Sequence, residues 1–97
     1  MSKYILGIDI GTSGTKAILM TTTGEIVAQK KDNYSFMTPH PGWAESNAED
    51  WLNAVTAVIR KLSSHVDDDD IVAIGMDGLY GGSGIPVDKD GSVLGPA

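Results

Sequence analysis

GIDIGTSGTK, residues 7–16, contains the strongest local signals of fold in this chain. It follows the apolar residues 4–6 and places Asp9 near the end of a predicted strand, ahead of a turn rich in glycine and hydroxyl side chains. The apolar residues 17–20 come next without any helix-capping signal. The sequence therefore predicts a hairpin, whereas the better-known phosphate-binding loops lead from a strand into a helix.

The residue types in this turn are those of an anion-binding site. Gly11 and Gly14 allow dihedral angles closed to other residues and a close approach of the backbone, so that successive N–H groups can converge on an anion. Thr12, Ser13 and Thr15 add hydroxyl donors. The pattern thus favours phosphate binding at the turn.

Charged residues flank the turn on both sides. A carboxylate such as Asp9 is costly to bury alone, and a divalent cation, directly or through its waters, would be a suitable partner. Lys16 adds a cation on the other side, and the same elements occur together in phosphoryl-transfer sites. An ordinary hairpin in which Asp9 caps the turn is the alternative, and the residues leave both interpretations open.

Composition excludes several classes of function. The chain of 97 residues has a net charge of −6 and no basic stripe, which argues against a nucleic-acid partner. It contains no cysteine, which excludes disulfides and thiolate metal sites. We expect no membrane association and a cytoplasmic location, because no apolar run is long enough to span a bilayer and the N-terminus lacks a signal-peptide pattern.

Turn and capping signals predict the next elements. Residues 21–24 are turn-forming and residues 25–30 resume a strand, which gives three consecutive antiparallel strands. Residues 31–41 are predicted to form a polar loop, with Tyr34, Phe36 and Met37 as expected anchors to the body of the domain.

Ser46 and Glu49 have the spacing of a capping box, so a helix is predicted over residues 47–64. Its apolar face, expected to lie on the sheet, consists of Trp51, Leu52, Val55, Val58, Ile59 and Leu62.

A second apolar run ends in another glycine-rich loop. Residues 71–76 are uninterrupted apolar residues and glycine, which is typical of a central strand covered on both faces. Residues 77–84 contain four glycines, which indicates close approach of a ligand or of another backbone, with a flexible turn as the alternative. The sequence of residues 88–91, Asp-Lys-Asp-Gly, predicts a final hairpin.

Three motifs in this order resemble the N-terminus of the FGGY carbohydrate kinases. They are Gly7-x-Asp9-x-Gly11-Thr12-Ser13-x-x-Lys16, then Pro41-Gly42-Trp43-Ala44-Glu45 before a helix with Trp51, then Ile74-Gly75 before a glycine loop and the hairpin at 87–91. The resemblance covers essentially the whole chain. It implies an α/β fold, an incomplete ribonuclease H-like (actin-like ATPase) domain that opens with three antiparallel strands, a helix and a further strand. Residues 1–97 would be the first part of the family's N-terminal domain.

The resemblance also implies an activity, which is ATP-dependent transfer of a γ-phosphoryl group to a hydroxyl of a sugar or polyol, with Mg²⁺. By similarity, Asp9 would bind the metal, and Asp9, Gly11, Thr12, Ser13 and Lys16 would hold the phosphates. Residues Leu79, Tyr80, Gly81 and Gly82 correspond to the segment that contacts the sugar. The general base is expected outside residues 1–97, so the resemblance assigns no catalytic residue here.

Family members are several times longer, so we expect a fragment with no useful kinase turnover of its own and an open sheet edge that favours self-association. The glycines after Tyr80 replace hydrogen-bonding side chains that several members carry, so no sugar is assigned. The roles of Trp43 and Glu45 stay open. One alternative is a non-catalytic nucleotide-binding module of the actin-like ATPase superfamily, and another is a natural short protein that serves as a dimerising or regulatory module.

Overall fold

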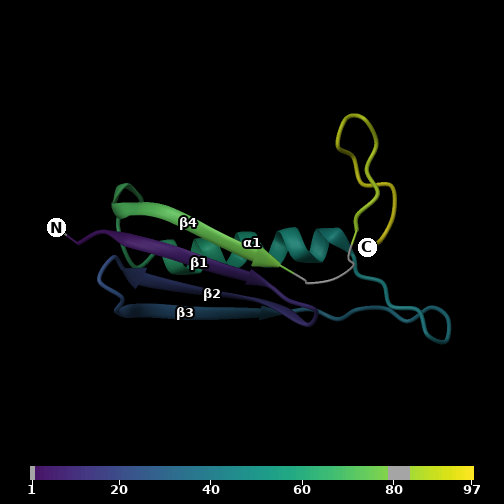
Figure 1. Ribbon diagram of the computed structural model, residues 1–97, viewed down its shortest axis with the longest axis horizontal. Coiled ribbons are helices and arrows are strands. Elements are labelled where there is room, and N and C mark those ends of the chain that lie inside the picture. The colour runs from purple at the N-terminus through teal and green to yellow at the C-terminus, as the bar shows by residue number, and fades with distance from the viewer. Residues whose placement is uncertain (1, 79–83) are drawn as a thin grey trace.

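A mixed four-stranded sheet with one helix against it is formed by the residues that the computed structural model describes, 2–78 and 84–97 (Figure 1). The strand order across the sheet is β3-β2-β1-β4. The elements are β1 (Tyr4–Ile10), β2 (Gly14–Thr21), β3 (Ile26–Asn33), α1 (Ala48–Ser63), a short 3₁₀ helix (Asp68–Asp70) and β4 (Ile71–Gly78).

The first three strands form an antiparallel meander, as predicted. In the first turn, the Gly11 N–H donates to the Gly14 carbonyl over 2.9 Å. The second turn contains Gly24, whose φ of 100° favours glycine. β2 and β3 both extend beyond their predicted bounds, because the pairing of residues 14–16 with residues 31–33 continues the ladder toward the first turn. After α1, the chain returns to pair β4 parallel to β1.

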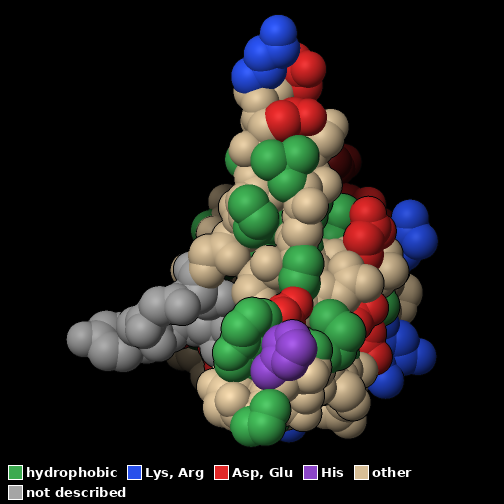
Figure 2. Space-filling view, turned by 90° about the vertical axis from the view of Figure 1, so that its right-hand side faces the viewer, with side chains coloured by type: hydrophobic (Ala, Val, Ile, Leu, Met, Phe, Trp, Pro, Cys, Tyr) green, Lys and Arg blue, Asp and Glu red, His purple; other side chains and the backbone are tan. Residues whose placement is uncertain are grey.

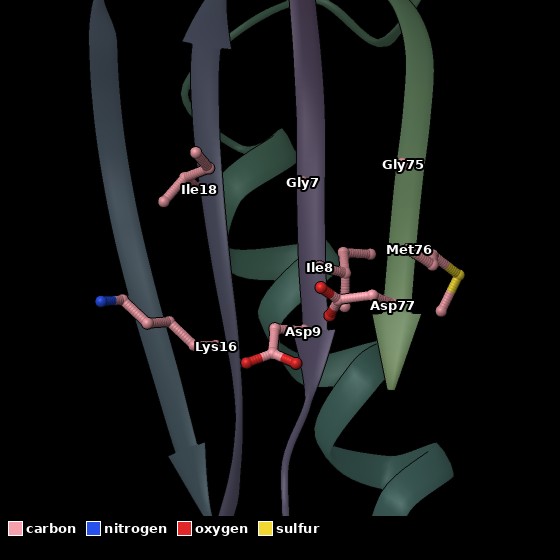
Figure 3. A pocket seen from close by; sticks show the side chains of 8 residues that line it. All are labelled: Gly7, Ile8, Asp9, Lys16, Ile18, Gly75, Met76 and Asp77. Carbon is pink, nitrogen blue, oxygen red and sulfur yellow. The ribbon is translucent and has the colours of Figure 1, made fainter. Parts of the chain in front are cut away.

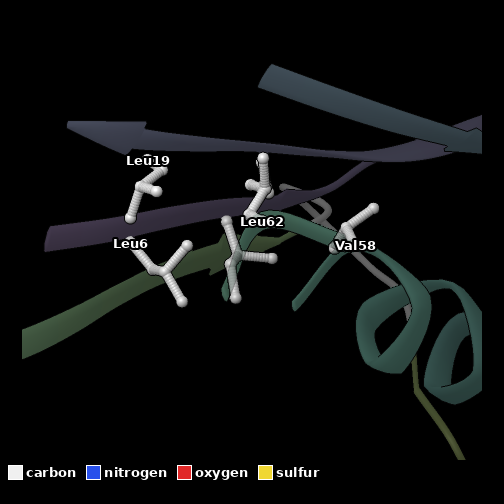
Figure 4. Close-up of a cluster of buried hydrophobic side chains, with 6 residues drawn as sticks. Leu6, Leu19, Val58 and Leu62 are labelled. Atoms are coloured by element: carbon white, nitrogen blue, oxygen red, sulfur yellow. The ribbon is translucent and has the colours of Figure 1, made fainter. Parts of the chain in front are cut away.

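Apolar residues that alternate along β1 and β2 meet one face of α1, which lies behind the sheet in Figure 1. Leu19 and Val58 are completely buried, and the leucines and Val58 interlock between the two layers (Figure 4). The core consists of Leu6, Ile8, Ala17, Leu19, Val58 and Leu62. Each leucine, isoleucine or valine side chain buried here contributes about 1.5–3 kcal/mol relative to leaving it exposed.

The start of α1 differs from the predicted capping box. Asn47 is the N-cap, and its side chain accepts a hydrogen bond of 3.0 Å from the Glu49 N–H. Ser46 lies one residue before the cap, and its backbone N–H and carbonyl both pair with Ala97. The predicted apolar face of α1 wrongly included Leu52, which is 63% exposed. Val58 and Leu62 are buried as expected.

β4 is an edge strand, so the prediction of a central strand covered on both faces is wrong for this structure. α1 packs on β1, β2 and β3, which leaves Val72, Ile74 and Met76 more than half exposed. An uninterrupted apolar run predicts a strand, but it does not say which neighbours cover it. None of the helices in the described ranges is long and apolar enough to cross a membrane.

The loop before α1 and the chain after residue 84 lie together at one end of the molecule. Tyr34 anchors this loop to the sheet, but Phe36 and Met37 are 45% and 47% exposed, contrary to expectation. Figure 2 views this end and shows a histidine among hydrophobic side chains, in keeping with the edge-on contact between His40 and Trp43. The predicted hairpin at 88–91 exists as a turn closed by a single bridge.

Candidate functional site

Two matching triplets, Gly7-Ile8-Asp9 and Gly75-Met76-Asp77, lie side by side on the parallel strands β1 and β4. The register pairs the two glycines with each other and the two aspartates with each other. Ile8 faces the core, so the alternation of a strand places Asp9, and Asp77 beside it, on the face turned away from α1. This surface, the open face, therefore carries a pair of carboxylates where both strands end.

A shallow hollow on the open face lies next to these carboxylates (Figure 3). The paired glycines leave its floor without side chains. A Cβ at Gly75 would meet nothing within 4 Å, so packing does not require glycine there, and a side chain would project into free space. The hollow is lined by Gly7, Ile8, Asp9, Lys16, Ile18, Gly75, Met76 and Asp77.

The two carboxylates influence each other electrostatically. The pKa of Asp77 is raised above its usual value, first by a hydrogen bond with Asp9 and then by the negative charge of Asp9, with a smaller contribution from burial. Figure 3 shows the Asp77 carboxylate directed across β1 toward Asp9. A cation bound between the two groups would remove this repulsion and lower the pKa of Asp77.

The turn at residues 11–14 begins immediately beyond Asp9. Thr12 and Ser13 are exposed, and within residues 2–78 and 84–97 nothing accepts a hydrogen bond from the backbone N–H of either. These two donors, with the two hydroxyls, are free to bind an anion from solvent.

Gly11 and Gly14 are needed for space, and the expectation of unusual dihedral angles is wrong. Neither has a positive φ. A Cβ at Gly14 would lie 2.9 Å from the Asp32 carbonyl oxygen, and one at Gly11 would lie 3.0 Å from the Gly14 carbonyl oxygen. The glycines thus permit close approach of the turn and β3, rather than a left-handed turn.

Thr15 and Lys16 lie on opposite faces of β2. Thr15 is 0% exposed on the helix side, so it cannot serve as the phosphate donor that its sequence position suggested. Lys16 pairs with Asp9 across β1 and β2, but its ammonium group points away, over β3 (Figure 3). The described residues include no ion pair between the two side chains.

Of the predicted site residues, the structure brings together Asp9, the turn residues Gly11, Thr12 and Ser13, and the backbone of Lys16. The predicted sugar segment Leu79, Tyr80, Gly81 and Gly82 lies outside the described residues. Sequence reasoning did not assign Asp77 to the site. The repeated triplet Gly-x-Asp at the end of two apolar runs was the signal that could have found it.

Comparisons with known proteins agree on one group of enzymes. Residues 4–97 match the FGGY family of carbohydrate kinases, N-terminal domain. The chain is 37% identical to a xylulose kinase of Klebsiella pneumoniae over 92 residues, which are 95% of this chain and 19% of that protein. It is 41% identical to a glycerol kinase of Trichodesmium erythraeum (strain IMS101) over 76 residues, which cover 76% of this chain and 15% of that protein.

The structural comparison extends this agreement to the fold. The crystal structure of gluconate kinase from Lactobacillus acidophilus superposes with a TM-score of 0.88 at 28% identity, over 99% of this chain and 19% of that one. This likeness confirms the predicted fold class, the actin-like ATPase fold of sugar kinases. The chain spans about a fifth of the length of these relatives.

Proposed function

Since the chain belongs to the FGGY family of carbohydrate kinases, we propose that it forms the opening part of that family's N-terminal domain and binds the phosphates of ATP. The reaction it serves is transfer of the γ-phosphoryl group to a hydroxyl of a sugar or polyol. The observation that carries the proposal is the arrangement of Asp9 and Asp77 beside a turn whose two exposed N–H donors have no acceptor among the residues that the structure describes.

In this proposal the exposed turn binds phosphate oxygens. The N–H groups and hydroxyls of Thr12 and Ser13 donate to them, and Gly11, where a Cβ would crowd the Gly14 carbonyl oxygen, lets the turn close in this shape. Lys16 is one strand away and its long side chain is exposed, so rotation about its bonds would bring the ammonium group to the phosphates. Catalysis by such a site depends on positioning and charge stabilisation.

Asp9 and Asp77 fit a magnesium ion. The described part of the chain adds no third acidic, histidine or cysteine side chain to this pair. Mg²⁺ usually keeps several waters and is bound through one or two carboxylates together with substrate phosphates, so two carboxylates suffice. The ion would neutralise charge on the phosphates and ease the repulsion that raises the pKa of Asp77.

The acceptor substrate would approach the same hollow. Its glycine floor leaves room beside the carboxylates, and residues 79–82 follow directly on β4. The relatives are xylulose, glycerol and gluconate kinases, so these three compounds are the first acceptors to test. The oxygen that attacks the γ-phosphorus must lose its proton to a base, and we assign that base to none of these 97 residues.

We also propose that the unpaired edge of β4 takes up another strand, which in the isolated chain comes from a second copy. Residues 71–76 carry no charge, whereas the opposite edge strand, β3, carries Lys30, Lys31 and Asp32. Charged side chains protect an edge from pairing, so the β4 edge is the less protected of the two. A mass that rises with concentration in analytical ultracentrifugation is expected, and a monomer throughout would contradict the proposal.

Calorimetric titration of the chain with Mg-ADP tests the binding function. Asp9→Asn should weaken binding at least tenfold, because it removes one of the two carboxylates and its charge. Asp90→Asn is the matched control, since Asp90 lies in the exposed turn at 88–92 and its substitution should leave binding unchanged. Equal affinities for all three chains, or no binding by the unaltered chain, would contradict the proposal.

A further inference from the structure

Tyr34 connects the end of β3 to both sides of the phosphate turn. Its hydroxyl donates a hydrogen bond of 2.6 Å to the Gly11 carbonyl oxygen, and its backbone N–H donates one of 3.1 Å to the Ser13 carbonyl oxygen. Thr12 lies between these two bonded residues. The segment that carries the unpartnered N–H donors is therefore held at both ends by one residue that is distant in sequence.

The direction of the hydrogen bonds follows from counting protons. A carbonyl oxygen only accepts, so the single Tyr34 hydroxyl proton goes to Gly11. The Thr15 hydroxyl, 3.3 Å from the Tyr34 oxygen, must then be the donor in that contact. Thr15 is 0% exposed, so the relay from Thr15 to Tyr34 to Gly11 starts inside the core. This relay fixes the Tyr34 hydroxyl in place.

Tyr34 acts from the side of the sheet opposite to the proposed ligand. Thr15 lies on the helix side with Ala17 and Leu19, whereas Asp9 and Lys16 lie on the open face. The Tyr34 hydroxyl thus reaches the turn from the core side and leaves Thr12 and Ser13 exposed to solvent. It constrains the turn without occupying the space that a phosphate needs.

We propose that Tyr34 is a positioning residue that holds residues 11–13 in the conformation that binds phosphate. A turn that is already ordered loses less conformational entropy on binding, so the hydrogen bonds of Tyr34 to the turn should raise its affinity for phosphate. The role toward phosphate rests on the proposed function, but the constraint on the turn does not. Through Tyr34, the packing of β3 against β2 determines the conformation of the turn.

Tyr34→Phe tests the proposal, because it removes the hydroxyl and keeps the ring. Tyr4→Phe is the matched control, since the described residues provide no hydrogen-bond partner for the Tyr4 hydroxyl. In hydrogen-exchange NMR, the bonded amides of Gly11 and Tyr34, which donate to the Gly14 and Ser13 carbonyls, should exchange about tenfold faster in Tyr34→Phe than in the unaltered chain, and no faster in Tyr4→Phe. Faster exchange spread evenly over the whole sheet would indicate a merely structural role and would overturn the proposal.

Affinity for Mg-ADP supplies the second readout. Tyr34→Phe should bind about tenfold more weakly, and Thr15→Val, which removes only the donor to Tyr34, about two- to threefold more weakly. A larger loss in Thr15→Val than in Tyr34→Phe would overturn the relay. If the unaltered chain binds no Mg-ADP, the proposed function fails, while the exchange measurement, which needs no ligand, still decides whether Tyr34 holds the turn.

Discussion

The two faces of the sheet are built from alternate residues of the same strands, yet they differ in almost every physical property. On the helix side, Leu6, Ile8 and Leu19 are buried under α1. On the open face, their neighbours Gly7 and Asp9 leave a hollow with charged walls. Because side chains in a strand alternate, a single short segment supplies both faces.

We therefore expect stability and the proposed binding to be separable in this chain. The helix side gains free energy from apolar burial, which is independent of any ligand. The open face places two acidic groups close enough to raise the pKa of one of them, which opposes folding at neutral pH. Substitutions on the helix side should therefore lower stability, whereas substitutions on the open face should change binding and leave stability almost unchanged.

The largest effect is expected from a core truncation on the helix side. Leu19→Ala should lower the free energy of unfolding by about 2–5 kcal/mol, because Leu19 is 0% exposed and a cavity would remain. Leu52→Ala makes the same chemical change at an exposed position of α1 and should cost less than about 0.5 kcal/mol. Urea unfolding followed by circular dichroism measures the free energy of unfolding of both variants. Equal decreases in the two variants would contradict the assignment of Leu19 to the core and of Leu52 to the surface.

A pair of glycine substitutions gives the next largest effect. Gly14→Ala should lower the free energy of unfolding by about 1–3 kcal/mol, because its Cβ would press on the Asp32 carbonyl oxygen. Gly75→Ala should leave stability almost unchanged, since its Cβ meets no atom within 4 Å, and it should also leave Mg-ADP binding at the turn unchanged, because it narrows only the hollow proposed for the acceptor. Unfolding and calorimetric titrations separate the two outcomes, and a Gly75→Ala chain that is unstable would contradict the account of the open face.

The smallest effect concerns the acidic pair. Asp9→Asn should lower the pKa of Asp77 toward its usual value of 3.8, because it weakens the hydrogen bond by replacing a carboxylate acceptor with an amide oxygen and it removes the charge of Asp9. The folded state of the unaltered chain binds the Asp77 proton more tightly than the unfolded state does. The stability that the bound proton contributes is therefore present below pH 3.8 and is lost as the pH rises through the raised pKa, and Asp9→Asn should weaken this pH dependence. Carboxyl NMR titration measures the shift, and an unchanged Asp77 pKa would contradict the coupling.

The sequence predicted the elements of the fold well, because local signals specify them. The apolar runs of β1 and β4, the turn at residues 21–24 and the periodicity of α1 each depend on nearby residues. The placement of β4 at an exposed edge depends on which elements cover it, and no local pattern in an apolar run contains that information. For the same reason, the exposure of Phe36 and Leu52 was not predicted.

The candidate site was predicted in part. Asp9 and the turn could be proposed from the sequence because they lie within one continuous stretch. Asp77 was missed because its relation to Asp9 arises only when β4 pairs parallel to β1, a contact between residues 68 positions apart. The buried position of Thr15 likewise follows from strand alternation relative to the helix, which the turn residues alone do not define.

The most direct test of separable faces is a map of amide chemical-shift changes in the labelled chain on addition of Mg-ADP. The account predicts changes at Asp9, at residues 11–13, at Lys16 and at Asp77, with the amides of α1 unaffected. Well-dispersed spectra in which α1 shifts while residues 9–13 do not would contradict the assignment of binding to the open face.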